Sequence, residues 1–240
     1  MVHTASNLND AQAIKELVTH GKVERAVVIG GGFIGLEMAE ALADMWEVET
    51  SIVEYTRQIM PGFVSSMFAR MAQREMEKNG VRFYLGEQVQ ALEGTDSVKT
   101  VVTDKRRLDA DLVVMAVGVT PNMELARDAG LTIGPTGAIA VDEHLRTSDP
   151  AIYAGGDCVE VTNLVTHQKM PWPMGDAANL EGRVAAQNMV LGNNVEYEGF
   201  IGTGICKVFD YVAGSTGYLH RLRITGTTVV EHLCEGNAHR

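Results

Sequence analysis

The chain has little of several residue types that mark particular classes of protein. Only three of its 240 residues are cysteines, none of them in a Cys-x-x-Cys pair, so a disulfide framework is not expected. The longest uninterrupted apolar run covers residues 112–117, which is far too short to span a bilayer. The amino terminus also lacks the charged and apolar regions of a signal peptide. These absences predict a soluble, cytoplasmic protein with no membrane partner.

Positive charge is scarce as well. The chain has 20 Lys and Arg against 31 Asp and Glu, a formal net charge of −11, so its general field opposes binding to nucleic acid. One group near the carboxyl terminus, His232, Cys234 and His239, fits no standard zinc spacing, and no metal site is predicted. With 45% hydrophobic residues the chain can still bury a sizeable core, in one large domain or two smaller ones.

Residues 27–54 are the most informative segment, because they combine a strand, a glycine-rich turn, a helix and a second strand. A buried-strand run at 27–29 leads into a G-x-G-x-x-G turn, and the helix-like stretch 36–43 follows. In such a turn the first glycine permits the bend, the second lets a diphosphate approach the backbone, and the third lets helix and strand pack closely. Unpaired N–H groups at the positive end of the helix then hold the phosphates. The turn consists of Gly30, Gly31, Gly32, Phe33, Ile34 and Gly35.

The second strand of this segment, residues 48–53, ends at Glu54. An acid at this distance from the last glycine is placed to accept hydrogen bonds from the adenosine ribose hydroxyls. Its carboxylate would repel a 2′-phosphate, so the pattern predicts NAD(H) in preference to NADP(H). The alternative is an ordinary turn in another α/β protein, with Glu54 only a charge at the end of a strand.

The remaining pattern predicts alternating helices and strands. A first helix capped by Asn9 and Asp10 runs to about Thr19, and the proline- and glycine-containing loop 169–175 precedes a helix at 177–190. Residues from 200 onward alternate apolar and polar side chains, as strands of another domain would. Further helices are expected at 63–79 and 123–129, and strands at 81–85, 89–92, 98–103, 111–117, 138–141 and 151–154.

Three motifs together resemble the pyridine nucleotide-disulfide oxidoreductase family. Besides the glycine turn, residues 111–122 resemble the strand that closes the NAD domain, and residues 147–157 resemble the second flavin-binding motif. The resemblance implies an α/β fold: a Rossmann-like three-layer NAD-binding domain, part of an FAD-binding domain and the start of an α+β interface domain. The implied boundaries are a linker helix at 1–21, the NAD domain at 22–117, the second FAD segment at 118–195 and the interface segment at 196–240.

The resemblance also implies roles for individual residues towards NAD(H) and FAD. Asp157, which follows Gly156, would hold the ribityl chain of FAD, and the helix start at Ala177 and Ala178 would face the flavin pyrimidine ring. Phe33 resembles an aromatic gate over the flavin, although it could also merely pack the helix start. Glu37 resembles a glutamate that pairs with a lysine beside the flavin, or is an exposed helix carboxylate.

Three weaker candidates complete the predicted site. Tyr55 and Val89 would enclose the adenine, and Gly118 would let the nicotinamide approach the backbone.

Residues 202–217 resemble the branch that contains coenzyme A-disulfide reductases, NADH oxidases and persulfide reductases, in which this segment opens the interface of a homodimer. The first flavin fingerprint and the redox-active cysteine of the family are not found in the sequence, so we expect a fragment. The first hypothesis is therefore part of an NADH-dependent flavoprotein that passes hydride to FAD and on to a small disulfide, persulfide or oxygen-type acceptor. The second is a non-catalytic NAD-binding module. A flavin-free dehydrogenase ranks last, because no Tyr-x-x-x-Lys signature is present.

Overall fold

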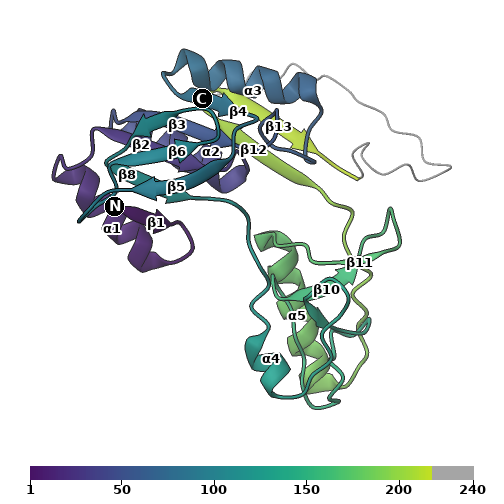
Figure 1. The fold of residues 1–240 in the computed structure, drawn as a ribbon. Helices are drawn as coiled ribbons and strands as arrows, with labels where there is room; N and C mark the ends of the chain where they lie inside the picture. Colours follow the sequence, from purple (N-terminus) through teal and green to yellow (C-terminus); the bar gives the residue numbers. More distant parts are fainter. Residues whose placement is uncertain (218–240) are drawn as a thin grey trace. The chain divides into compact units, whose positions relative to one another are not determined.

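The computed structural model describes residues 1–217 and shows two compact units. The first unit consists of residues 1–118 together with 204–215, and the second of residues 119–203. Each unit has its own hydrophobic core. Figure 1 shows the elements of both units.

The first unit is built on a five-stranded parallel sheet. The strand order is β1-β8-β2-β3-β4, and every neighbouring pair is parallel. Continuous runs of Val and Ile make β2, β3 and β8 buried along most of their length, as expected when both faces of a parallel sheet are covered. The strands are β1 (Val2–Thr4), β2 (Arg25–Ile29), β3 (Glu49–Glu54), β4 (Arg82–Leu85) and β8 (Leu112–Met115).

Helices cover one face of this sheet and a three-stranded antiparallel sheet covers the other. Side chains from the helices share a core with Val28 and Ile52, whereas Val27 and Val53 pack with the antiparallel strands. The helices are α1 (Leu8–Thr19), α2 (Phe33–Glu40), the π-helical turn η1 (Ala41–Met45) and α3 (Ser66–Lys78). The antiparallel strands are β5 (Val89–Glu93), β6 (Thr100–Thr103) and β7 (Arg107–Asp109).

A hairpin from late in the sequence packs onto the helical side of the first unit. Its strands, β12 (Gly204–Val208) and β13 (Tyr211–Ser215), run beside α3 in Figure 1. Cys206, Val208 and Ala213 alternate inward and join the core of the helical face. Cys206 is thus a buried residue of this core.

The second unit packs a long helix against a small sheet. Its strands lie in the order β11-β10-β9, and Val184 and Ala185 of the helix join Val159 and Val161 in one core. The elements are α4 (Glu124–Asp128), β9 (Ile139–Ala140), β10 (Val159–Thr162), β11 (Lys169–Met170) and α5 (Gly175–Leu191).

Some sequence expectations differ from the structure. The predicted strand 151–154 makes only one isolated bridge, between Tyr153 and Arg146. The first helix is capped by the Asn7 side chain, which accepts the Asp10 N–H (2.9 Å), and not by Asn9 and Asp10. Residues 1–21, expected as a linker helix, also supply the edge strand β1. Within residues 1–217 no helix is long and apolar enough to cross a membrane.

Candidate nucleotide-binding site

The glycine-rich turn lies where the strand order of the parallel sheet reverses. From the central strand β2 the chain passes to β3 on one side, and β8 lies on the other side. The turn follows the carboxyl end of β2, next to that of β8, and open parallel sheets bind their ligands at such a point. The Ala116 N–H donates to the Ile29 carbonyl oxygen (2.8 Å), so the two strands stay paired up to the turn.

The three motif glycines meet three different surroundings. Gly30 has φ +113°, and a Cβ there would lie 2.1 Å from the Ala116 carbonyl oxygen. A Cβ on Gly35 would lie 2.0 Å from the Gly30 carbonyl oxygen, so helix α2 can approach β2 only without a side chain. A Cβ on Gly32 would meet nothing within 4 Å. The first and third glycines are therefore required by packing, and the second faces open space.

The peptide of Gly31 is clamped on both sides. Its N–H donates to Oε2 of Glu54 (2.7 Å), and its carbonyl oxygen accepts the Met60 N–H (2.7 Å). These bonds hold the turn against the end of β3 and the loop that follows. The geometry of the turn is thus fixed by the protein itself.

The first turn of α2 presents backbone donors next to this open space. Gly32 caps the helix, and the first intrahelical bond runs from the Leu36 N–H to the Gly32 carbonyl oxygen (3.0 Å). The N–H groups of Phe33, Ile34 and Gly35 precede that bond, so the helix itself offers them no acceptor. Unpaired donors at a helix amino terminus form a site for anions such as phosphate.

Glu54 also stabilises the glycine turn, a role that was not predicted from the sequence. The residue is only 8% exposed, and its Oε1 accepts the Thr56 N–H (2.7 Å) while Oε2 accepts that of Gly31. Each oxygen retains a further lone pair, because a carboxylate can accept about four hydrogen bonds. Glu54 therefore fixes the turn and still has acceptor capacity for a ligand.

The other predicted residues of this unit differ in their surroundings. Phe33 opens α2 and makes an edge contact with Phe63 (ring centroids 4.6 Å apart), and Glu37 is exposed one turn further. Tyr55 is 72% exposed beside Glu54. Gly118, at φ +110°, follows the end of β8. Val89 packs against the core between the two sheets, which includes Ile29 and Val53.

In the second unit the structure brings the predicted flavin-binding residues together at the start of α5. Gly156 has φ +87°, and a Cβ there would lie 3.7 Å from the Cβ of Ala178. Asp157 follows and is exposed, whereas Ala177 is buried in the first turn of the helix.

Glu181 holds this arrangement and was missed in the sequence. It is 1% exposed, and its Oε2 accepts the Gly156 N–H (2.6 Å). Burial raises the pKa of the Glu181 carboxyl, and the charge of Asp157 acts in the same direction. No local signal marks this glutamate, because its partner lies 25 residues earlier in the chain.

The two described cysteines lack the lowered pKa that is typical of a reactive thiol. Burial raises the pKa of the Cys158 thiol, and burial with the charges of Glu37 and Glu40 raises that of Cys206 to about 11. Both groups are therefore protonated at neutral pH. Cys234 and its neighbouring histidines lie outside the described residues, and residues 1–217 contain no group of His, Cys, Asp and Glu suited to a metal.

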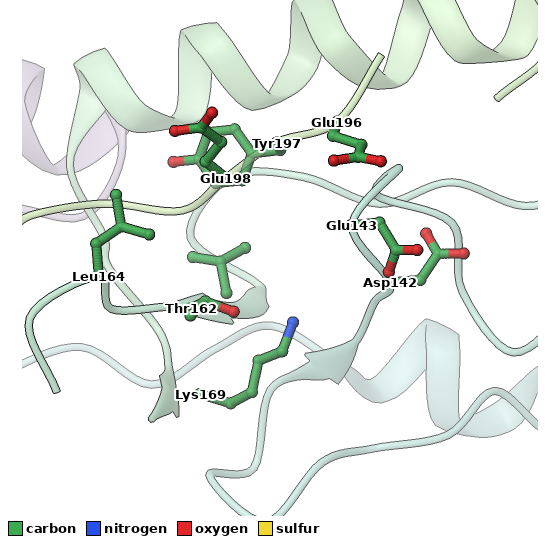
Figure 2. A pocket seen from close by; sticks show the side chains of 9 residues that line it. Asp142, Glu143, Thr162, Leu164, Lys169, Glu196, Tyr197 and Glu198 are labelled. Carbon is green, nitrogen blue, oxygen red and sulfur yellow. The ribbon is translucent and has the colours of Figure 1, made fainter. Parts of the chain in front are cut away.

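A separate hollow of about 530 Å³ in the second unit contains none of the predicted site residues. Figure 2 shows the side chains that line it, which include four carboxylates and the single cation Lys169. This surplus of negative charge disfavours a diphosphate. The carboxylates belong to Asp142, Glu143, Glu196 and Glu198.

Comparisons with known proteins agree with this geometry. The family described as pyridine nucleotide-disulphide oxidoreductase matches residues 1–175. The chain is 38% identical over 216 residues to an NAD(P)H coenzyme A polysulfide/persulfide reductase of Pyrococcus horikoshii, covering 90% of this chain and 48% of that protein. It is 36% identical to an NADH oxidase of Methanocaldococcus jannaschii, with the same coverage of 90% and 48%.

A solved structure is similar as well. The crystal structure of an FAD-dependent pyridine nucleotide-disulphide oxidoreductase from Desulfovibrio vulgaris superposes with a TM-score of 0.84 at 48% identity, covering 90% of this chain and 55% of that one. The chain spans about half the length of the curated relatives it matches. The chain belongs to the pyridine nucleotide-disulphide oxidoreductase family, in the branch of coenzyme A or persulfide reductases and NADH oxidases.

Proposed function

We propose that this chain is the NADH-binding portion of an FAD-dependent oxidoreductase. The observation that carries the proposal is the clamped glycine turn: Gly30 and Gly35 are held by close backbone contacts, while Gly32 opens onto free helix donors. Such a turn at the point where strand order reverses is suited to a dinucleotide diphosphate.

Different residues in and around the turn would bind different parts of the dinucleotide. The N–H groups of Phe33, Ile34 and Gly35 would donate to the diphosphate, and the positive end of α2 would favour its charge. Glu54 would accept from the ribose hydroxyls with its remaining lone pairs. Tyr55 and Val89 remain candidates for enclosing the adenine, and Gly118 for the nicotinamide end.

The start of α5 would serve FAD. Gly156 brings the backbone close to Ala178, and Asp157 is exposed beside it, where its carboxylate would accept from the ribityl hydroxyls. Ala177 and Ala178 would direct the helix amino terminus at the pyrimidine ring. Bound flavin supplies hydride acceptance from nicotinamide and delivery to a further acceptor. Phe33 would gate the flavin, and Glu37 would pair with a lysine beside it.

The acceptor is proposed by class only. Two similar proteins are named for persulfide reduction and NADH oxidation, so we propose a small disulfide, persulfide or oxygen-type acceptor, in a homodimer. A non-catalytic NAD-binding module is the alternative outcome of the experiment.

An absorbance spectrum of the purified chain, followed by NADH addition, tests this proposal. We expect flavin bands that bleach when NADH is added, because hydride then reaches the flavin. A colourless protein that still binds NADH in a fluorescence titration would support the module. A chain that binds neither NADH nor flavin would contradict both.

A further inference from the structure

The turn that carries Asp157 is built on two consecutive glycines. A Cβ on Gly155 would lie 3.2 Å from the Cβ of Glu181, and Gly156 has φ +87°, so neither position readily accepts a side chain. The Gly156 carbonyl oxygen accepts the Val159 N–H (3.2 Å), which closes a tight turn with Asp157 inside it. The direction of the exposed Asp157 carboxylate therefore depends on the conformation of the two glycines.

The peptide between these glycines can take two orientations unless a partner selects one. Glycine lacks a Cβ and adopts positive and negative φ about equally well, so reversing a peptide between two glycines meets little steric resistance. In the structure the N–H of this peptide, which belongs to Gly156, donates to Oε2 of Glu181 (2.6 Å). Its carbonyl oxygen, which belongs to Gly155, accepts from the Cys158 thiol (3.6 Å). A thiol is a weak donor, so the bond to Glu181 is the stronger of the two.

Glu181 is held firmly enough to select the orientation. Its side chain is 1% exposed on α5, and the Tyr197 hydroxyl is a second hydrogen-bond partner of its carboxyl. Burial raises the pKa of Tyr197, so this hydroxyl remains protonated and can donate. In the reversed orientation the Gly155 carbonyl oxygen would meet the ionised Glu181 carboxylate, acceptor against acceptor. The bond to Glu181 therefore favours the observed orientation of the peptide and with it the present direction of Asp157.

We propose that Glu181 is a positioning residue for FAD, which holds the 155–156 peptide so that the Asp157 carboxylate is presented to the ribityl hydroxyls. The proposal rests on the proposed role of Asp157 towards FAD. Because its own carboxyl is buried, Glu181 acts on the ligand only through the N–H of Gly156. The requirement is for an acceptor oxygen at this point, which a glutamine would also supply.

FAD titrations of the 240-residue chain, followed by quenching of flavin fluorescence, test this role. We expect Glu181→Leu to lower FAD affinity by about tenfold or more, because leucine offers no acceptor to the Gly156 N–H. Leucine is apolar and similar in length, so it suits a buried position. Glu181→Gln keeps an acceptor oxygen and should remain within about threefold of the unmodified chain at neutral pH.

A buried polar residue of the same helix provides the matched control. Asn188 is also 1% exposed on α5, and its side chain bonds the backbone at His144, Asn194 and Val195. Asn188→Leu should therefore lower the stability of the second unit and leave the FAD affinity of the folded chain within about twofold.

A measurement without flavin checks the bond itself. Amide hydrogen exchange of Gly156, read by NMR in the flavin-free chain, should be about tenfold or more faster in Glu181→Leu than in the unmodified chain. Glu181→Gln should retain the slow exchange. Asn188→Leu should not accelerate Gly156 more than the other amides of the second unit.

The outcomes separate this proposal from the one on which it rests. Unchanged FAD affinity in Glu181→Leu, or an equal loss in Asn188→Leu, would overturn the positioning role and leave the FAD site intact. Equal losses in Glu181→Gln and Glu181→Leu would also overturn it, as would the same Gly156 exchange rate in all variants. An unmodified chain that binds NADH but no FAD would overturn the FAD function of this chain and the positioning role together.

Discussion

Among single residues, Gly32 and Gly35 of the same motif differ in whether the fold leaves room for a side chain. Gly35 is enclosed, since any Cβ there would overlap the Gly30 carbonyl oxygen, whereas Gly32 has extended backbone dihedrals and open space around it. A side chain at Gly35 must therefore disturb packing, and one at Gly32 need not. The two positions separate a structural role from a binding role.

This contrast gives a paired prediction for Gly32→Val and Gly35→Val. We expect Gly32→Val to lower NADH affinity by about 100-fold or more while costing less than about 1 kcal/mol of stability. Gly35→Val should lower the free energy of unfolding by about 1–3 kcal/mol or more, because it forces backbone apart. Urea denaturation and NADH titration of both variants provide the measurements. Unchanged NADH affinity in Gly32→Val would remove the turn from the nucleotide site.

Glu181 makes a second residue-level prediction, which concerns pH. Its pKa in the folded protein is raised above the ordinary value of 4.5, so between these two values the folded state binds the proton more tightly than the unfolded state. Protonated Glu181 therefore stabilises the folded protein. This contribution to the free energy of unfolding is fully present below pH 4.5, the ordinary pKa, and is lost as the pH rises through the pKa of the folded protein. In Glu181→Gln the side chain stays neutral, and this loss should disappear.

We therefore expect the free energy of unfolding of Glu181→Gln to equal that of the unmodified protein at a pH near 4.5. With rising pH it should become relatively more stable, by at most about 1.4 kcal/mol per pH unit, until the folded pKa is passed. Urea unfolding followed by Trp172 fluorescence in the Trp46→Phe background, at a series of pH values, measures the difference. Glu198→Gln, at an exposed position in the same unit, is the control and should show no such trend. A constant difference at all pH values would show that the Glu181 pKa is not raised.

At the scale of elements, the sequence predicted those elements whose pattern is long or whose ends are chemically marked. The strand–turn–helix around Gly30 and the helix later found as α5 were predicted for this reason, and both are confirmed. Within α3 the large apolar residue Met67 is 51% exposed, whereas Ala69, Ala72 and Met76 are buried. Alanines form much of this buried face, so the spacing of large apolar residues does not predict it.

Strand pairing was harder to predict, because it depends on distant partners. The strand β1 is only Val2–Thr4 and exists because it pairs with β8, more than 100 residues away. The segment 151–154 has a strand-like sequence, yet its only bridge in the described chain joins Tyr153 to Arg146. The stabilisation of the glycine turn by Glu54 was not predicted for the same reason, because Glu54 accepts the N–H of Gly31, which lies 23 residues away in the sequence.

At the scale of the whole molecule, the two units have separate cores and one tryptophan each. Trp46 packs against the core of the first unit, and Trp172 stacks on Phe200 in the second (ring centroids 4.8 Å apart). The chain has only these two tryptophans, so the variants Trp172→Phe and Trp46→Phe each report the unfolding of one unit. The response of each unit to a ligand can thus be measured separately.

We expect NADH to stabilise the unit that contains Trp46 and not the other. At 100 times its dissociation constant a ligand that binds only the folded state adds about 2.7 kcal/mol, so the Trp46-reported urea midpoint should rise with NADH concentration. The Trp172-reported midpoint should stay constant, because the proposed diphosphate donors all lie in the first unit. Introducing Gly32→Val should abolish the rise, which ties it to the glycine turn. Equal shifts of both midpoints would instead mean that the two cores unfold as one cooperative body, and a shift only at Trp172 would place the nucleotide in the second unit.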